Sequence, residues 1–102
     1  MIRSRIHKLI AEDHSHSVVL QSLQNVGYRY QGKKTTDSHT LHTLKYHQKA
    51  SYDHNARVKS VLTKHGFVHT KLANGHNYKR ADAEIGIKSV TGATRLQYLH
   101  RN

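Results

Sequence analysis

Cysteine, proline and tryptophan are absent from this chain of 102 residues, and there are only 6 glycines. Without cysteine the chain forms no disulfide bonds and has no thiolate chemistry. Without proline, and with so few glycines, no stretch has the composition of an interdomain linker. A chain of this length supports one compact domain, so we expect residues 1–102 to form a single domain.

Long apolar runs are also missing. No stretch approaches the ~18 apolar residues that are needed to span a bilayer. The first ten residues, MIRSRIHKLI, are basic but lack the continuous apolar stretch of a signal peptide. We therefore expect no membrane partner and a cytoplasmic location, which is the interior of a host cell if the chain is phage-encoded.

Acidic residues are scarce. The chain has 17 Lys and Arg but only 6 Asp and Glu, and its formal net charge is +11 with all 11 His counted as neutral. Self-repulsion at this charge opposes compaction, and an anionic partner would relieve it. Nucleic acid, either DNA or RNA, is the commonest such partner for a small basic domain. The alternative at this point is a basic composition with no role in binding.

Three segments have apolar residues at helical spacing. The first ends near Asp13, the second ends near Val26 and the third covers Gln48 to His65; the first two could equally be one bent helix. Gly27 and Gly66 follow the last two segments, where a C-cap glycine belongs.

Alternating apolar and polar residues predict strands between and after these helices. Strands are expected at Tyr28–Tyr30, at His39–Tyr46, at Phe67–Leu72, and from Tyr78 through Ile85 and Ile87. A polar turn from Gly32 to Asp37 separates the first two, and Asn74–Gly75 forms a turn whose residues tolerate positive φ. The segment from Ala93 to His100 fits either a helix or a strand.

The predicted fold class is therefore α+β, with two or three helices packed on a small antiparallel sheet of hairpins. Two helix-β-β repeats are an alternative description of the same pattern. Placing Gly27 over Gly66 superposes Val19 on Val58, Leu23 on Leu62 and Tyr28 on Phe67. Because any helix–glycine–strand unit needs residues of these types, common local structure explains the match equally well.

Aromatic and basic residues gather between Gly27 and Lys34. On a strand, Tyr28 and Tyr30 share a face, Arg29 lies on the other, and Lys33 and Lys34 follow in the turn. Aromatic rings can stack on bases while cations hold phosphates, and Tyr78 to Arg80 repeats the mixture. The candidate nucleic-acid-binding residues are Tyr28, Arg29, Tyr30, Lys33, Lys34, Tyr78, Lys79 and Arg80. The alternative for each Tyr is that it covers the core, as aromatic strand residues usually do.

Two predicted helices carry further basic groups. The N-terminal one has Arg3, Arg5 and Lys8, and the later one has Arg57, Lys59 and Lys64. Each set would either follow a phosphate backbone or form an ordinary solvated helix face.

The 11 histidines suggest metal binding or acid–base catalysis. Their scattered positions lack the Cys or carboxylate ligands typical of zinc sites, so we expect neither a metal nor a cofactor. A ribonuclease would need His69, His76, Tyr78, Lys79 and Arg80 to gather at the Asn74–Gly75 turn, and nothing in their spacing requires it. Asp82 and Glu84 are expected to temper the neighbouring Lys79 and Arg80. If many His are exposed, binding to an anion should tighten below about pH 6.5.

These observations predict a non-catalytic nucleic-acid-binding protein. The alternative is a small inhibitor or adaptor, of the phage or mobile-element type, that docks on an acidic surface of a host protein or nucleoprotein complex. A homodimer is compatible with either function. A nucleic-acid binder should show the steeper salt dependence of the two.

Overall fold

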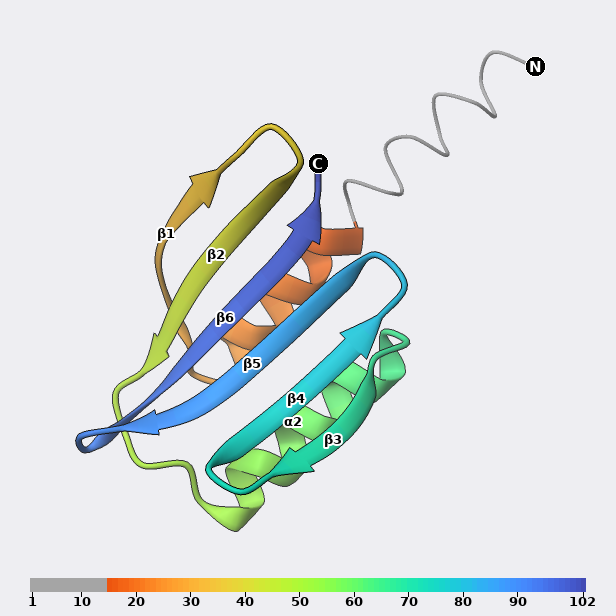
Figure 1. Ribbon diagram of the computed structural model, residues 1–102. Coiled ribbons are helices and arrows are strands. Elements are labelled where there is room, and N and C mark those ends of the chain that lie inside the picture. Colours follow the sequence, from red (N-terminus) through yellow and green to blue (C-terminus); the bar gives the residue numbers. More distant parts are fainter. Residues whose placement is uncertain (1–14) are drawn as a thin grey trace.

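The computed structural model describes residues 15–102, shown in sequence colours in Figure 1. They form two helices and a 6-stranded antiparallel sheet in the order β1-β2-β6-β5-β4-β3. The α+β class is therefore confirmed, while the helix expected to end near Asp13 lies outside the described residues. The elements are a helix over 15–25, β1 (Arg29–Thr35), β2 (His39–Tyr46), α2 (Tyr52–Lys64), β3 (Val68–Leu72), β4 (Gly75–Arg80), β5 (Ala83–Val90) and β6 (Ala93–Arg101).

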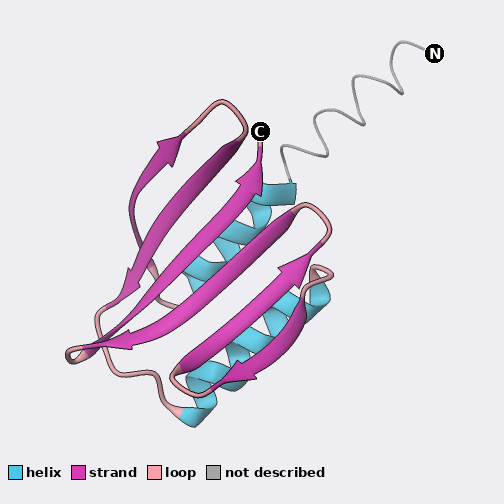
Figure 2. Ribbon diagram, in the orientation of Figure 1, coloured by secondary structure: helices cyan, strands magenta, loops and turns pink. Residues whose placement is uncertain are grey.

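Both helices lie on the same side of the sheet, the helix over 15–25 behind β6 and α2 behind β4 and β3 (Figures 1 and 2). Burial of apolar area between these two layers supplies most of the favourable free energy of folding. The buried cluster joins residues of both helices to residues of the strands: Val19, Leu23, Tyr28, Leu44, Val58, Leu62, Phe67, Tyr78, Ala83, Ile85, Ile87, Leu96 and Tyr98. Among residues 15–102, no helix is long and apolar enough to cross a membrane.

The two helices end in the same way. The Tyr28 N–H donates to the Leu23 carbonyl (3.1 Å) just as the Phe67 N–H donates to the Leu62 carbonyl (3.0 Å). Gly27 and Gly66 precede these two aromatic residues and have φ of 114° and 87°, which places both in the region that favours glycine. Each ending is thus a Schellman cap that directs an aromatic residue into the core. The local superposition expected from the sequence is present, and a duplication in origin stays a hypothesis.

The β1–β2 hairpin is longer than predicted. Lys33 and Lys34 were expected in a turn, but they pair with His42 and Leu41 in the ladder. The register shifts between Tyr30 and Gly32, so a bulge accommodates the extra residue without ending the strand. This correction gives the two lysines opposite faces of the sheet.

In the C-terminal half, one open alternative is resolved and one expectation changes. The ambiguous tail from Ala93 is strand β6, which pairs with both β2 and β5. The turn between β3 and β4 consists of residues 73–74, and neither Asn74 nor Gly75 has a positive φ. Gly75 is needed for a steric reason instead, because a Cβ built there would lie 2.1 Å from the Ile87 carbonyl oxygen.

Candidate nucleic-acid interface

The sheet face opposite the helices, here called the open face, carries a row of basic side chains. Arg29 is the cross-strand partner of Lys45, Lys45 of Arg95, and Arg95 of Lys88. Cross-strand partners project from the same face, and neighbouring strands lie about 4.8 Å apart. These four residues, the cationic row, therefore cross four adjacent strands over roughly 14 Å.

Other cations lie further along the strands on the open face. Lys34, Lys79 and Arg101 are exposed at positions that alternate with core-facing residues. Glu84 is the carboxylate that shares the open face; it stands opposite Lys79 and accepts a hydrogen bond from the Asn77 side chain at 3.1 Å. The balance of charge on the open face is strongly positive.

The cationic row has an electrostatic cost in the free protein. Like charges placed directly opposite each other on a sheet are destabilising. Within residues 15–102, the side-chain ion pairs are those of Asp82 with Arg80 and His16, and none involves the cationic row. The row is thus a surface on which an anion would lower the energy of the fold.

The centre of the open face is uncharged. Leu41 pairs with Leu99, and Thr43 pairs with Gln97. No Tyr or Phe occupies an open-face position in the six strands that the structure describes. The face offers charge and hydrogen bonds to a partner, without an aromatic platform for bases.

Of the candidate residues predicted from the sequence, Arg29, Lys34 and Lys79 lie on the open face, but only Arg29 belongs to the cationic row. Lys33 is exposed on the other face, beside His42. Tyr30 is 41% exposed, yet it also lies on the helix side, where its hydroxyl is hydrogen-bonded to His42 Nδ1 at 2.8 Å. Tyr30 and Lys33 therefore do not contribute to the open face.

Tyr28 and Tyr78 are corrections to the predicted site, because both belong to the core. Each is 2% exposed, so neither ring is accessible to a base. Burial raises the pKa of Tyr78 to about 12 and raises the pKa of Tyr28 as well. The Tyr28 hydroxyl is hydrogen-bonded to His54 Nε2 at 3.3 Å, which satisfies its polar atom inside the core.

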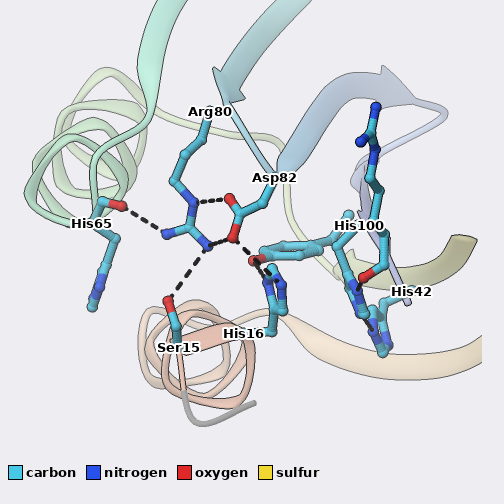
Figure 3. A network of polar contacts seen from close by, with 9 residues as sticks. Ser15, His16, His42, His65, Arg80, Asp82 and His100 are labelled. Atoms are coloured by element: carbon cyan, nitrogen blue, oxygen red, sulfur yellow. Dashed lines mark hydrogen bonds and ion pairs between the residues drawn. The ribbon is translucent and has the colours of Figure 1, made fainter. Parts of the chain in front are cut away.

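Arg80 is a second correction, since its guanidinium is held inside the protein (Figure 3). Its side chain is 15% exposed and forms an ion pair with Asp82 at 2.5 Å. It donates to the His65 carbonyl at 2.8 Å and to Ser15 Oγ at 3.4 Å, and it lies over the Phe67 ring. Arg80 therefore links the end of α2 to the helix over 15–25 and is not available for phosphates.

Asp82 has a structural role within this network. Burial alone would raise the pKa of its carboxyl, but the hydrogen bond and charge of Arg80 lower it below its ordinary value. Its other oxygen lies 3.7 Å from His16 Nε2. As expected from the sequence, Asp82 forms an ion pair with Arg80. Glu84 stands opposite Lys79.

Histidines form a second polar cluster next to Asp82, also seen in Figure 3. His42 Nε2 and His100 Nε2 share a hydrogen bond at 2.9 Å, and the rings of His100 and His16 stack at 4.1 Å. Burial, then the charges of His100, Lys33 and His16, lower the pKa of His42 to about 4. Among the described residues, no group of three or more His, Asp or Glu is arranged to hold a metal ion.

Sequence reasoning missed part of the cationic row. Lys88 and Arg95 are not among the predicted candidates; for Arg95 the reason is that the segment from Ala93 fits a helix as well as a strand. Alternation along β6 was the available signal: Arg95, Gln97, Leu99 and Arg101 face outward, and Thr94, Leu96 and Tyr98 face the core. Comparisons of the chain with protein-family models, with curated proteins and with solved structures each find no match.

Proposed function

We propose that this protein binds nucleic acid through the open face of its sheet, without catalysis. The observation that carries the proposal is the cationic row, Arg29–Lys45–Arg95–Lys88, in which like charges are cross-strand neighbours without a carboxylate partner among the described residues. A polyanion would neutralise several of these charges at once and release its own counterions. That gain offsets the repulsion built into the row.

The proposed mode of binding is phosphate capture. Lys and Arg side chains are long enough to follow a phosphate backbone across the sheet, with Thr43, Gln97 and Asn77 available as neutral hydrogen-bond partners. Base stacking on Tyr28 or Tyr78 is excluded by their burial. Binding of this kind depends on backbone charge, so we expect weak sequence preference.

A fluorescence-anisotropy titration with labelled single-stranded and duplex DNA and RNA at several salt concentrations tests the proposal. Contact of the cationic row with four phosphates predicts a slope of log K against log salt of about −3 to −4 on duplex DNA. The double variant K88E/R95E should bind at least ten-fold more weakly. An affinity that is insensitive to salt, or unchanged in this variant, contradicts the proposal.

Docking on an acidic protein surface is a second candidate function, and one observation favours it. Leu41 and Leu99 are paired at the centre of the open face, and Leu99 remains 36% exposed. An apolar centre with a charged rim resembles the anatomy of protein–protein interfaces. This function predicts a shallow salt dependence and capture of one acidic partner, with Leu99→Gln weakening it more than Arg95→Gln.

The expected cytoplasmic location and the homodimer stay predictions within this proposal. Fractionation of cells that express the chain tests the location. Sedimentation of the free protein tests the dimer.

A further inference from the structure

A cavity of about 550 Å³ lies on the helix side of the sheet, away from the open face. One wall is a stripe of α2 that includes Tyr52, Asn55 and Lys59, and the other wall is formed by β3 and β4. This stripe is distinct from the one that α2 buries in the core through Val58 and Leu62. The volume lies within the range of about 300–1,000 Å³ that is typical of small-molecule sites.

The charge around this cavity has one sign. Lys59 reaches it from α2 and Lys71 from β3, so two ammonium groups line opposite walls. No Asp or Glu is among the described residues that line it, and the neutral polar groups there include Asn55, Ser60 and Thr63. These walls suit a small anion of nucleotide size.

A histidine pair also lines this cavity. His69 Nε2 and His76 Nδ1 are hydrogen-bonded at 2.8 Å, and the His69 ring stacks on Tyr78 with centroids 4.7 Å apart. One of the two bonded nitrogens donates and the other accepts, so the pair shares a single proton. Protonating both rings breaks this bond and frees two N–H donors.

The surroundings of the pair favour its neutral form. Lys59 and Tyr52 face it from α2, Lys71 from β3 and Tyr78 from β4. Burial, then Lys59 and Lys71, lower the pKa of His69; burial, then Lys71 and His69, lower the pKa of His76. A bound dianion neutralises the charge of the two lysines and would favour the doubly protonated pair.

We propose that this cavity binds a phosphomonoester of nucleotide size, held by Lys59, Lys71 and the His69–His76 pair. A phosphomonoester has a second pKa near 6, carries close to two charges at neutral pH and presents three acceptor oxygens. It therefore matches two lysines and two imidazolium donors better than a carboxylate does. Tyr52, which is 88% exposed at the rim, offers a ring face to the attached base.

Either a free mononucleotide or the phosphorylated end of a strand would supply this group. Histidine-detected NMR of the full chain with adenosine 5′-monophosphate, adenosine and single-stranded DNA with or without a 5′-phosphate distinguishes them. The single-stranded DNA probes are added to the K88E/R95E variant, so that binding at the open face does not interfere. The nucleotide, the phosphorylated strand or both should shift the His69 and His76 resonances and raise the pKa of both rings.

Lysine variants complete the test. K59Q/K71Q should weaken phosphomonoester binding about ten-fold or more, whereas K64Q, on the same helix but outside the cavity, should leave it unchanged. Binding should tighten between about pH 7.5 and pH 6. Equal binding of adenosine, an unaffected double variant, or no response to either phosphorylated probe overturns the proposal. K88E/R95E should lose binding at the open face but retain this cavity. A failure of the phosphomonoester proposal is therefore distinguishable from a failure of the open-face function.

Discussion

Lys45 of β2 and Arg95 of β6 are direct cross-strand partners on the open face, although 50 positions separate them in the sequence numbering. Their neighbours along the same row are Arg29 and Lys88. Strand structure does not require cations at cross-strand positions. Two residues from Lys45 and Arg95, the same strands β2 and β6 place the neutral Thr43 opposite Gln97. The register thus concentrates charge where a polyanion can reach it.

Removing one charge from the row should reduce the salt dependence of nucleic-acid binding. Arg95→Gln should lower the magnitude of the log–log salt slope by about 1, because one phosphate contact is lost. Arg57→Gln, which removes an exposed charge on α2, is the matched control and should leave the slope unchanged. Equal effects of the two variants would mean that net charge, and not the cationic row, determines affinity.

The same row should make the free protein less stable than it would be without it. Lys45→Thr places a good strand former between Arg29 and Arg95 and removes the repulsion of Lys45 with both. The free energy of unfolding should therefore rise by about 0.5 kcal/mol. Denaturant titrations in low salt and in about 1 M salt measure this difference, since added salt screens the repulsion. A gain that persists in high salt would trace to strand propensity and not to charge.

Residues with clear local signals were the ones whose structure could be predicted. Gly27 and Gly66 follow apolar residues at helical spacing, and a Schellman cap needs nothing from distant parts of the chain. Alternation in His39–Tyr46 likewise placed Leu44 and Tyr46 on one face. These features are decided within a few residues, so sequence pattern alone suffices for them.

The cationic row could not be predicted because it depends on which strands pair. Nothing local indicates that β2 lies beside β6, or that Lys45 stands opposite Arg95. The same limit applies to Tyr28 and Tyr78, because the sequence leaves both a core role and a binding role open until the face covered by the helices is known. The difference between the predicted candidate residues and the cationic row therefore comes from long-range strand pairing.

Lys79 and Arg80 are adjacent in β4 and should respond in opposite ways to substitution. Arg80→Gln removes the ion pair with Asp82 and the hydrogen bond to His65, and should reduce the free energy of unfolding by about 2–3 kcal/mol with little effect on the affinity of the folded protein. Lys79→Gln should weaken nucleic-acid binding with little effect on stability. Denaturation and anisotropy measured on both variants check this. Loss of affinity in folded Arg80→Gln would contradict the structural role of Arg80.

Acid should destabilise the fold through His42. The pKa of His42 is lowered to about 4, so below its unfolded value near 6.5 the unfolded chain binds a proton that the folded chain does not. Stability contributed by neutral His42 is thus complete above about pH 6.5 and is lost as pH falls to 4, by about 3 kcal/mol. His42→Asn should flatten the pH dependence of the unfolding free energy in this window, and His47→Asn, at an exposed position, should not. Parallel curves for wild type and His42→Asn would exclude His42 as the cause.

Gly75 of β4 pairs with Lys88 of β5, and Gly86 of β5 pairs with Asn77 of β4, yet only Gly75 should resist substitution. A Cβ at Gly75 would meet the Ile87 carbonyl oxygen at 2.1 Å, whereas a Cβ at Gly86 meets nothing within 4 Å. Gly75→Ala should therefore cost about 2 kcal/mol or more, since backbone must move to make room. Gly86→Ala should be neutral or stabilising by up to about 1 kcal/mol, because it reduces the entropy of the unfolded chain at an unstrained strand position. Thermal and urea denaturation of the two variants measures the contrast. If Gly75→Ala were as well tolerated as Gly86→Ala, β4 and β5 would approach each other less closely at Gly75 than the structure places them.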